Sequence, residues 1–359
     1  MSSERIAIIG CGAIGGTILA YLARGDRDVT GIDPWQERVY RIAAEGLTLE
    51  GVDESFTVWP RVVFFDEVPR EKFDVVILSV KGYDNRWAAL YAGDILKTDG
   101  VLLSAQNGLH EIALPGLVGE DRVAGCVVAM GAEALGPAAV KCSTGNERPH
   151  LFVGELSGRE SPRVTWLTEL LKPAGPVQAT TEIWAELWSK MTQNVMSNGL
   201  AGVCGFTAGR LWTDPRCTDI VIALAHECAL VARAQGSSIH PILGTLSSRL
   251  LEAAERPGTP AWDEATALLS AEGRKRTGKR DNASSLLQDL WKGRRTEVDY
   301  FNGVLADLGA RFGVPTPVSV LIAETVHRLE RQQLRTGPEL LDEVHTLVLQ
   351  QIDQRQEYQ

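Results

Sequence analysis

The chain has 359 residues and a formal net charge of −10; 44 % of its residues are apolar and 23 % are charged. A chain of this length is too long for a single hydrophobic core and suits two domains of roughly 150 to 200 residues each. The composition excludes the classes of disordered and membrane proteins. The negative charge repels phosphate backbones and anionic lipids, so we expect neither nucleic acid nor a membrane as a partner.

Cysteine and histidine usage indicates no metal site. The histidines show no metal-ligand spacing such as HExxH, and no two cysteines fall two residues apart. We expect reduced, mostly buried cysteines and no structural zinc. The chain starts without a signal-peptide pattern and has no apolar run near the length of about 18 residues that spans a membrane, so the expected location is the cytoplasm.

The first predicted strand, residues 6–9, leads into a glycine-rich turn and then a helical pattern. This is the setting in which GxGxxG binds a dinucleotide: the first glycine permits a tight turn, the second admits the pyrophosphate, and the third lets helix and strand pack. The helix N-terminus offers its N–H groups to the phosphates. We therefore expect cofactor contacts from Gly10, Gly12, Ala13, Ile14 and Gly15.

Asp33 ends the second predicted strand, residues 28–33, where an acidic residue binds the adenosine ribose. A carboxylate accepts hydrogen bonds from the ribose hydroxyls of NAD and repels the 2′-phosphate of NADP. NAD(H) is therefore favoured, and Arg38 is the only nearby cation that argues otherwise. The alternative is that Asp33 merely caps the helix beginning at Pro34.

Short apolar runs alternate with helical patterns through this half of the chain. This order predicts an α/β Rossmann-type domain with a doubly wound parallel sheet, in which ligands lie beyond the strand C-termini. The predicted domain covers residues 1–181. After the first two strands, its predicted elements are strands at 57–59, 62–65 and 73–80, a helix at 86–91, strands at 101–104, 123–129, 139–142 and 150–155, a helix at 163–171 and a strand at 177–181.

Two polar residues follow central strands of this predicted sheet. Lys81 comes directly after the strand that ends at residue 80, and Asn107 follows the strand at 101–104. Both should face the nicotinamide end of the site. A lysine leaving a strand and an Asn-Gly turn would explain either residue separately.

Strand signals stop after residue 181, so residues 182–359 are predicted to form an all-α domain. A helix start with proline in its first turn marks Pro215 and leads to a helix that ends near Gly236. Further helices are expected at 243–254, 261–269, 285–291, 297–312, 317–333 and 338–351.

Lys190, Asn194 and Asn198 are four residues apart and form one row on a helix, a cation followed by two amides. An apolar row that includes Trp184 and Trp188 runs beside it and should face a core. The polar row then lies at the rim of the core, where a lysine loses solvation and can act as a proton donor. A solvated helix face is the alternative.

A basic run at residues 273–280 interrupts the acidic C-terminal half. Most runs of this kind are solvated loops. The sharper hypothesis is a flap over an anionic ligand.

Together these motifs resemble the ketopantoate reductase family over most of the chain. The resemblance rests on Gly10-x-Gly12-x-x-Gly15, Lys81, Gln106-Asn107-Gly108, the Lys190 row, Ser284-Ser285-x-x-Gln288-Asp289 and Arg294-Arg295-Thr296-Glu297-x-Asp299-Tyr300-x-Asn302-Gly303. It implies a Rossmann domain joined to a helical domain, with the active site in the cleft between them. Residues 241–282 carry insertions relative to this family and precede Ser285, so the substrate pocket can differ.

The resemblance also implies residue roles. Lys190 is the general acid that protonates the ketone oxygen as hydride arrives, and Glu297 is its partner carboxylate near the cofactor. Lys81 lies by the nicotinamide ribose. Substrate hydroxyl and carboxylate groups are held by Asn107, Asn194, Asn198 and Ser285. Because the family usually prefers NADPH, NADP(H) is the alternative cofactor.

The leading hypothesis is an NAD(H)-dependent oxidoreductase that interconverts a ketone, such as a 2-keto acid or hydroxyketone, with its alcohol. The alternatives are an NADPH-dependent 2-dehydropantoate 2-reductase and, from another class, a non-catalytic dinucleotide sensor. Opine-type condensation would need an amine substrate, and no histidine-centred site supports it. A homodimer is expected, as dimers are the commonest symmetric assembly.

Overall fold

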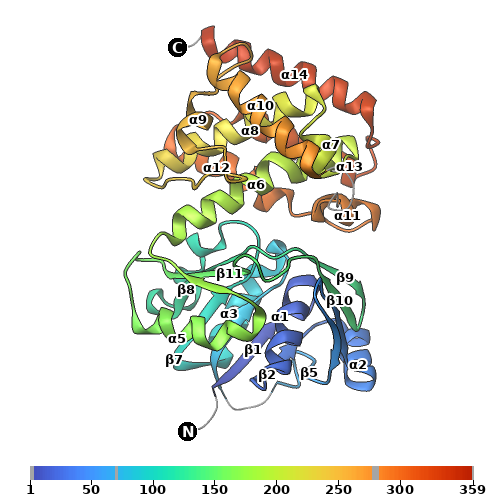
Figure 1. The fold of residues 1–359 in the computed structure, drawn as a ribbon, viewed down its shortest axis with the longest axis vertical. Helices are drawn as coiled ribbons and strands as arrows, with labels where there is room; N and C mark the ends of the chain where they lie inside the picture. The colour runs from blue at the N-terminus through green and yellow to red at the C-terminus, as the bar shows by residue number, and fades with distance from the viewer. Residues whose placement is uncertain (1–3, 69–71, 277–282, 358–359) are drawn as a thin grey trace. The chain divides into compact units, whose positions relative to one another are not determined.

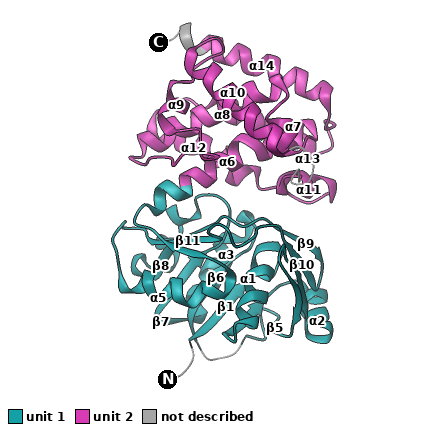
Figure 2. Ribbon diagram, viewed as in Figure 1, with its two compact units in different colours: residues 1–187 teal, residues 188–359 magenta. Residues whose placement is uncertain are grey.

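The computed structural model describes residues 4–68, 72–276 and 283–357. These fall into two compact units, residues 1–187 and 188–359, shown in Figure 2. Helix α6 (Ile183–Cys204) crosses the division. The predicted domain boundary after residue 181 lies just ahead of this helix.

The main sheet of the first unit has eight strands in the order β12-β11-β8-β7-β6-β1-β2-β5 (Figure 1). Neighbouring strands within the described residues run parallel, except at the β11–β8 pair. The strands are β1 (Arg5–Ile9), β2 (Asp28–Ile32), β5 (Arg61–Val63), β6 (Phe73–Leu78), β7 (Leu96–Ser104), β8 (Val123–Val128), β11 (Leu151–Glu155) and β12 (Val177–Ala179).

Alternate residues of the central strands face opposite sides of this sheet. On β1, Ile6 and Ile8 join one apolar core while Ala7 and Ile9 join the other. Residues of α1 (Ala13–Arg24), α2 (Gln36–Glu45) and α5 (Pro162–Leu171) belong to the first core, and those of α3 (Asn85–Ile95) and α4 (Leu114–Val118) to the second. Helices cover both faces, which confirms the predicted doubly wound fold.

A second sheet of four strands, in the order β4-β3-β10-β9, packs against α1. The strand predicted at residues 57–59 lies here, because β4 forms an antiparallel hairpin with β3. We did not predict β3, which starts directly after Gly46, where a φ of 80° ends α2. The strands are β3 (Leu47–Glu50), β4 (Ser55–Val58), β9 (Ala132–Gly136) and β10 (Ala139–Cys142).

The second unit is helical, as predicted. Apolar residues of α6 and α8 form much of its buried core. No described helix is long and apolar enough to cross a membrane. All six cysteines are free and buried. The helices after α6 are α7 (Ala208–Leu211), α8 (Pro215–Ala234), α9 (Ser248–Ala253), α10 (Pro260–Arg276), α11 (Ser285–Trp291), α12 (Asn302–Phe312), α13 (Pro317–Glu330) and α14 (Pro338–Glu357).

The helices predicted at 317–333 and 338–351 end at Glu330 and Glu357. Three further predicted bounds in this unit were also wrong, for reasons that the structure shows. The helix expected from residue 243 begins only at Ser248, because Leu243 and Gly244 have positive φ angles of 57° and 76°. Glu297 does not open a long helix; it precedes the short 3-10 helix η5 (Val298–Tyr300), and α12 starts at Asn302.

The third error concerns the basic run. Residues 274–276 form the last turn of α10 rather than a loop, whereas 277–280 lie outside the described residues. Gly273 does not break this helix. A Cβ there would lie 2.8 Å from Cγ2 of Thr213 and 3.0 Å from the carbonyl oxygen of Gly209, so the glycine lets α10 approach the α7 segment closely.

Candidate active site

Helix α6 carries the predicted polar row beside a buried apolar stripe. Trp188, Met191 and Val195 are fully buried, and Trp188 Nε1 donates a hydrogen bond to Oε1 of Gln235, 3.1 Å away. On the neighbouring row, Lys190 is partly exposed, while Asn194 and Asn198 are each only 7 % exposed. A row that includes two buried amides is not a solvated helix face.

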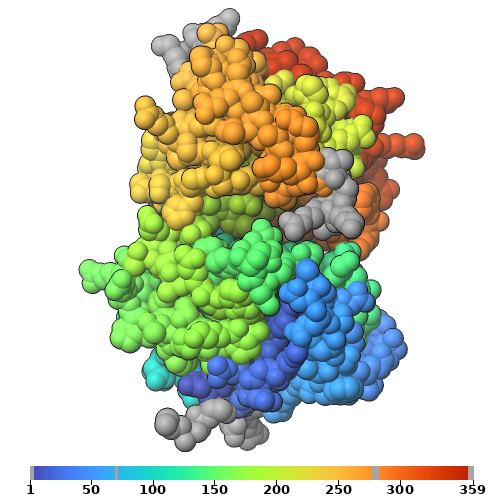
Figure 3. Space-filling view, in the orientation of Figure 1, coloured from blue at the N-terminus to red at the C-terminus, as the bar shows by residue number. Residues whose placement is uncertain are grey.

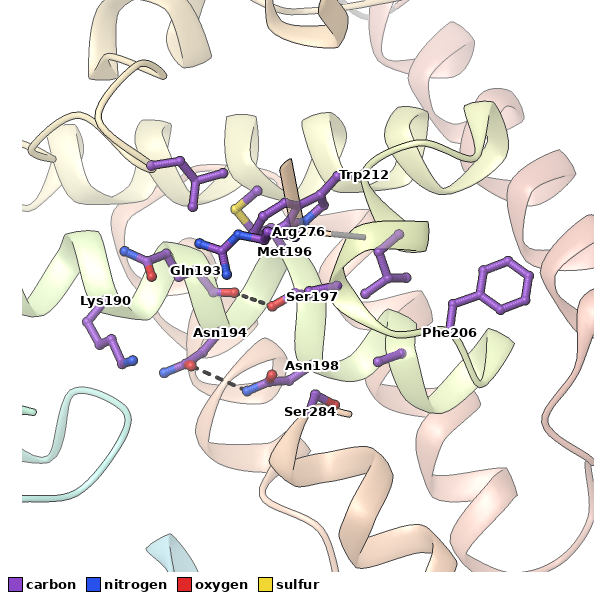
Figure 4. A pocket seen from close by; sticks show the side chains of 14 residues that line it. Lys190, Gln193, Asn194, Met196, Ser197, Asn198, Phe206, Trp212, Arg276 and Ser284 are labelled. Atoms are coloured by element: carbon purple, nitrogen blue, oxygen red, sulfur yellow. Dashed lines mark hydrogen bonds between the residues drawn. The ribbon is translucent and has the colours of Figure 1, made fainter. Parts of the chain in front are cut away.

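The polar row lines a cavity of about 190 Å³ within the helical unit (Figure 4). Nδ2 of Asn198 donates a hydrogen bond to Oδ1 of Asn194, 3.3 Å away. Nδ2 of Asn194 is itself buried and has no hydrogen-bond partner among the described residues. The described lining residues are Lys190, Gln193, Asn194, Met196, Ser197, Asn198, Ala201, Phe206, Ala208, Leu211, Trp212, Leu243, Arg276 and Ser284.

The charge of this cavity is positive. Lys190 and Arg276 are its ionisable residues, and its described wall contains no carboxylate. A buried amide donor without a partner costs free energy unless a ligand or water supplies an acceptor. Because the protein as a whole is acidic, this local arrangement favours a small anionic or carbonyl-bearing ligand.

The cavity includes Ser284 rather than the predicted Ser285. Ser284 is the N-cap of α11, where its Oγ accepts a hydrogen bond from the backbone N–H of Leu287, 3.2 Å away. Ser285 is the first residue of the helix and is exposed. The role assigned to Ser285 stays a prediction.

Glu297 is 5 % exposed and is not among the residues that line the cavity. Contacts on both sides fix its segment to α13. The backbone N–H of Thr296 donates a hydrogen bond to Oε1 of Glu330, 2.7 Å away. His327 lies 2.8 Å from Oδ1 of Asp299 through Nε2 and 3.0 Å from Oε2 of Glu330 through Nδ1. The segment that carries the carboxylate predicted to assist catalysis is therefore bonded to α13 on both sides of Glu297.

In the first unit, the glycines of the turn adopt a backbone that other residues could not easily share. Gly10 has a φ of 91°, and a Cβ there would lie 2.8 Å from the carbonyl oxygen of Ser79. A Cβ on Gly15 would lie 1.9 Å from the carbonyl oxygen of Gly10. Gly12, the N-cap of α1, has open space where its side chain would be. Ala13 and Ile14 follow as the first, partly buried residues of the helix.

Asp33 is tied to this turn. Its Oδ2 accepts a hydrogen bond from the backbone N–H of Cys11, 2.7 Å away, and its Oδ1 accepts one from the N–H of Trp35, 2.9 Å away. The N-cap of α2 is Trp35, so Asp33 does not cap that helix in the usual way. Arg38 Nε lies 3.6 Å from Asp33 Oδ2, and the guanidinium also donates to the carbonyl oxygen of Cys11.

Lys81 and Asn107 follow neighbouring parallel strands at the same sheet edge as the glycine turn. Gln106 Nε2 donates a hydrogen bond to the carbonyl oxygen of Val80, 3.1 Å away, which joins the two loops. Asn107 is partly exposed and precedes Gly108, whose φ is 113°. The structure thus brings the predicted cofactor residues Gly10 to Gly15, Asp33, Lys81 and Asn107 to one edge of the sheet.

Family comparison agrees with this geometry. The family model of ketopantoate reductase PanE/ApbA matches residues 6–157, and the model of its C-terminal part matches residues 182–330. The chain belongs to the ketopantoate reductase family. It is therefore an oxidoreductase of a family that acts on CH–OH groups, with a nicotinamide dinucleotide as cofactor.

Relatives of this ketopantoate reductase family member match nearly the whole chain. A 2-dehydropantoate 2-reductase from Archaeoglobus fulgidus is 26 % identical over 332 residues, covering 92 % of this chain and 99 % of the relative. Another from Mesorhizobium japonicum is 27 % identical over 349 residues, covering 90 % and 97 %.

Solved structures share the fold of this ketopantoate reductase family member. D-mandelate dehydrogenase with NADH and anilino(oxo)acetate has a TM-score of 0.76 at 23 % identity, covering 92 % of this chain and 99 % of the other. A ketopantoate reductase from Ralstonia eutropha has a TM-score of 0.74 at 26 % identity, with the same coverage.

The sequence patterns do not identify most of the wall residues in this family member, nor one buried acid. Arg276 falls in a basic run that is typical of a loop, and the predicted serine is Ser285 rather than its neighbour Ser284. The N-cap preference for serine was the signal that could have separated Ser284 from Ser285. Glu111 is buried in the η2 turn (His110–Ile112), where burial raises the pKa of its carboxyl to about 8.

Proposed function

We propose that the chain transfers a hydride between NAD(H) and a ketone/alcohol pair, with a 2-keto acid as the ketone and Lys190 as the general acid. The observation that carries this proposal is the Lys190–Asn194–Asn198 row on the wall of a positive cavity, with a buried amide donor of Asn194 that lacks a partner. A carbonyl or carboxylate oxygen is the acceptor that this donor requires.

The proposed chemistry follows from the residue types. When bound, the reduced nicotinamide supplies the hydride. Lys190 donates a proton to the substrate oxygen while negative charge develops there, because an ammonium group at a partly buried position is both a cation and an acid. The two amides, Asn194 and Asn198, orient the substrate. Glu297 acts as the partner carboxylate of the lysine.

Asp33 supports NAD(H) as the cofactor. Asp33 already accepts two backbone hydrogen bonds, and a carboxylate has further lone pairs for ribose hydroxyls. Arg38 argues for NADP(H), since an arginine near this position can hold a 2′-phosphate. However, its guanidinium already contacts Asp33 and Cys11 and lies 5.0 Å from the Trp35 ring centroid.

Replacing Asp33 by Ala should reduce the ratio of kcat/KM with NADH to kcat/KM with NADPH. An unchanged ratio would mean that Asp33 does not determine the cofactor preference.

The decisive test of catalysis is Lys190→Ala. This variant should lose turnover of every carbonyl substrate while NADH binding, measured by fluorescence, stays intact. Lys292→Ala removes an exposed lysine at the end of α11 and serves as the matched control. Near-wild-type rates in Lys190→Ala would refute the assignment. Tight NADH binding by the wild type without activity on any substrate would instead support the dinucleotide sensor.

The second candidate is an NADPH-dependent 2-dehydropantoate 2-reductase. The name of the relatives from Archaeoglobus fulgidus and Mesorhizobium japonicum favours it. An assay of ketopantoate reduction with each cofactor separates the two candidates: a clear optimum with ketopantoate and NADPH would select this one.

We also propose a homodimer. A solved Staphylococcus aureus ketopantoate reductase with the same fold is described as dimeric. Light scattering coupled to size-exclusion chromatography would give the mass directly; a mass near 39.0 kDa would show a monomer.

A further inference from the structure

We propose that Glu111, in its neutral form, positions the two loops that carry Lys81 and Asn107. Glu111 is 1 % exposed, so it acts through other side chains, those of Ser104 and Gln106, and is a positioning residue rather than a catalytic one. The inference rests on the part of the proposed function that places Lys81 and Asn107 at the cofactor. It does not depend on the identity of the carbonyl substrate.

A chain of hydrogen bonds joins the end of β7 to the loop that follows β6. Ser104, the last residue of β7, is fully buried, and its Oγ donates to Oε1 of Gln106, 3.3 Å away. On the face that Figure 3 shows, other segments hide most of the cyan segment around residue 100, which belongs to β7. Nε2 of Gln106 donates to the carbonyl oxygen of Val80, 3.1 Å away. Lys81 follows Val80 directly, and Asn107 follows the glutamine, so this one amide sets the spacing of the two loops.

The direction of these bonds is fixed by the groups that make them. A backbone carbonyl only accepts, so the amide nitrogen of Gln106 must face Val80. The amide oxygen of Gln106 then faces Ser104 and accepts the one hydroxyl proton of that residue. Because Ser104 has no second proton, a further neighbour can join the chain only by donating a hydrogen bond to its Oγ.

Glu111 is a neighbour that can do so. It lies in η2, and the Ser104 hydroxyl is near enough to affect the pKa of its carboxyl. Neither carboxyl oxygen has a hydrogen bond of ordinary length and angle within the described residues. Burial raises the pKa of this carboxyl to about 8, so at neutral pH it keeps the proton that the chain requires.

The ionised form of Glu111 would break this chain. A carboxylate only accepts, so it would take the hydroxyl proton of Ser104 for itself. The hydroxyl oxygen of Ser104 would then face the amide oxygen of Gln106 without a proton between them, and two acceptors in contact repel each other. We expect Gln106 to turn away from Val80 and both loops to loosen, which weakens binding of the nicotinamide cofactor.

The other ionisable groups around Glu111 stay neutral where it titrates. Residues Val101–Ser104 of β7 and the helix α4 carry no ionisable side chain, and β8 contributes only Cys126. Burial, with the charge of Glu111 added, raises the pKa of the Cys126 thiol to about 12. Burial lowers the pKa of His110 to about 4, although a hydrogen bond to the backbone of Asn107 opposes this shift. Both neighbours are therefore neutral while Glu111 changes charge.

The first experiment measures the Kd of NADH by cofactor fluorescence, with the full-length chain and no carbonyl substrate. From about pH 6.5 to about pH 9 the wild-type Kd should rise about tenfold, because only about a tenth of an acid with a pKa of about 8 is neutral at the upper end. Glu111→Gln should keep a low Kd throughout, since its amide can donate to Ser104 at every pH. Glu120→Gln, at an exposed position in the η3 turn (Glu120–Arg122), is the matched control and should keep the wild-type rise.

The second experiment interrupts the chain beyond Glu111. Ser104→Ala removes the hydroxyl that links the acid to Gln106, so the Kd of NADH at about pH 6.5 should rise about 3- to 10-fold. It should not rise further with pH. Gln106→Met keeps the length of the side chain without its amide and should behave in the same way, which provides a second variant if Ser104→Ala folds poorly. A wild-type Kd and a wild-type rise in both variants would show that Glu111 does not act through this chain.

The possible outcomes separate this inference from the proposed hydride transfer. A wild-type Kd that stays level over this pH range, or a Glu111→Gln variant that keeps the rise, would overturn the inference and leave the hydride transfer standing. Failure of the wild type to reduce any carbonyl, with the pH profile of NADH binding intact, would overturn only the hydride transfer. A wild type that binds neither NADH nor NADPH would refute both.

Discussion

The imidazole Nε2 of His327 on α13 lies 2.8 Å from Oδ1 of Asp299, two residues after Glu297. The same ring contacts Glu330, which in turn accepts the backbone N–H of Thr296 on the other side of Glu297. One histidine and one glutamate of α13 therefore fix both flanks of the segment that carries the proposed catalytic carboxylate.

We expect His327→Ala to lower kcat about 10- to 100-fold, because small displacements of a positioned group are costly to turnover. The KM for NADH should stay close to the wild-type value. Arg295→Ala removes the other, exposed partner of Asp299 and should have a much smaller effect. Steady-state kinetics on both variants checks this. An unaltered kcat in His327→Ala would mean that the contacts of His327 and Glu330 do not position Glu297.

Asn194 offers a separate test, because we expect its amide to matter little for stability and greatly for turnover. Its Nδ2 is buried without a partner among the described residues, while its Oδ1 accepts the hydrogen bond of Asn198. Asn194→Ala removes one buried donor without a partner and leaves another, Nδ2 of Asn198, so the free energy of unfolding should change by no more than about 1 kcal/mol. Turnover should fall about 100-fold, as for the loss of one donor to a developing oxyanion. Ser197→Ala is the comparison: its hydroxyl already donates to the Gln193 carbonyl oxygen within the helix. Strong destabilisation of Asn194→Ala with normal kcat/KM would make the residue structural.

The sequence was sufficient for the features that depend on local pattern. The glycine turn, the Asp33 position and the four-residue spacing on α6 all follow from strand and helix periods. The structure adds what periods do not encode. Arg276 reaches the cavity only because Gly273 lets α10 continue against the α7 segment, and a glycine within a basic run reads as a loop until that contact is known.

The burial of Glu111 could not be predicted from the sequence pattern either. Glu111 follows a turn-like Asn-Gly-Leu-His stretch, in which a solvent-facing carboxylate is the ordinary expectation. It lies near Cys126 of β8: desolvation by burial raises the pKa of that thiol to about 12, and the charge of Glu111 adds to the shift. Only tertiary packing determines this environment.

Glu111 predicts a particular dependence of stability on pH. Burial raises its pKa from 4.5 to about 8, so the folded state retains a proton that the unfolded chain releases. The associated stability is complete below pH 4.5 and is lost as pH rises to about 8. Burial lowers the pKa of His110 from 6.5 to about 4, which acts in the opposite direction but only below pH 6.5.

Between pH 6.5 and 8, therefore, the pKa shift of Glu111 changes the free energy of unfolding with pH, and the pKa shift of His110 does not. At about 1.36 kcal/mol per pH unit, wild-type stability should fall by about 2 kcal/mol over this interval because of Glu111. The neutral, isosteric variant Glu111→Gln should lack this contribution. Urea denaturation of both proteins at the two ends of the interval measures the difference. Parallel pH profiles would contradict a protonated Glu111.

Glu227 provides the last prediction, which concerns stability alone. This carboxylate on α8 is fully buried and lies at the N-terminus of α13, where negative charge is favourable. Its Oε1 accepts the N–H of Val318 at 2.9 Å, and its Oε2 accepts the N–H and the hydroxyl of Ser319 at 2.9 and 2.7 Å. Glu227→Ala leaves these donors buried without acceptors.

We expect Glu227→Ala to lower the free energy of unfolding by about 3 to 5 kcal/mol, the usual cost of removing one partner from a buried charged network. Glu227→Gln should lose less, because its amide oxygen can still accept one of the bonds. Glu324→Ala, at an exposed position on α13, is the control and should remain within about 0.5 kcal/mol of the wild type. Thermal and urea unfolding give these values. If Glu227→Ala were as stable as Glu324→Ala, water or neighbouring groups would have to accept the hydrogen bonds of the N–H groups at the start of α13. His327 and Glu330, on the same helix, would then keep their positions without Glu227.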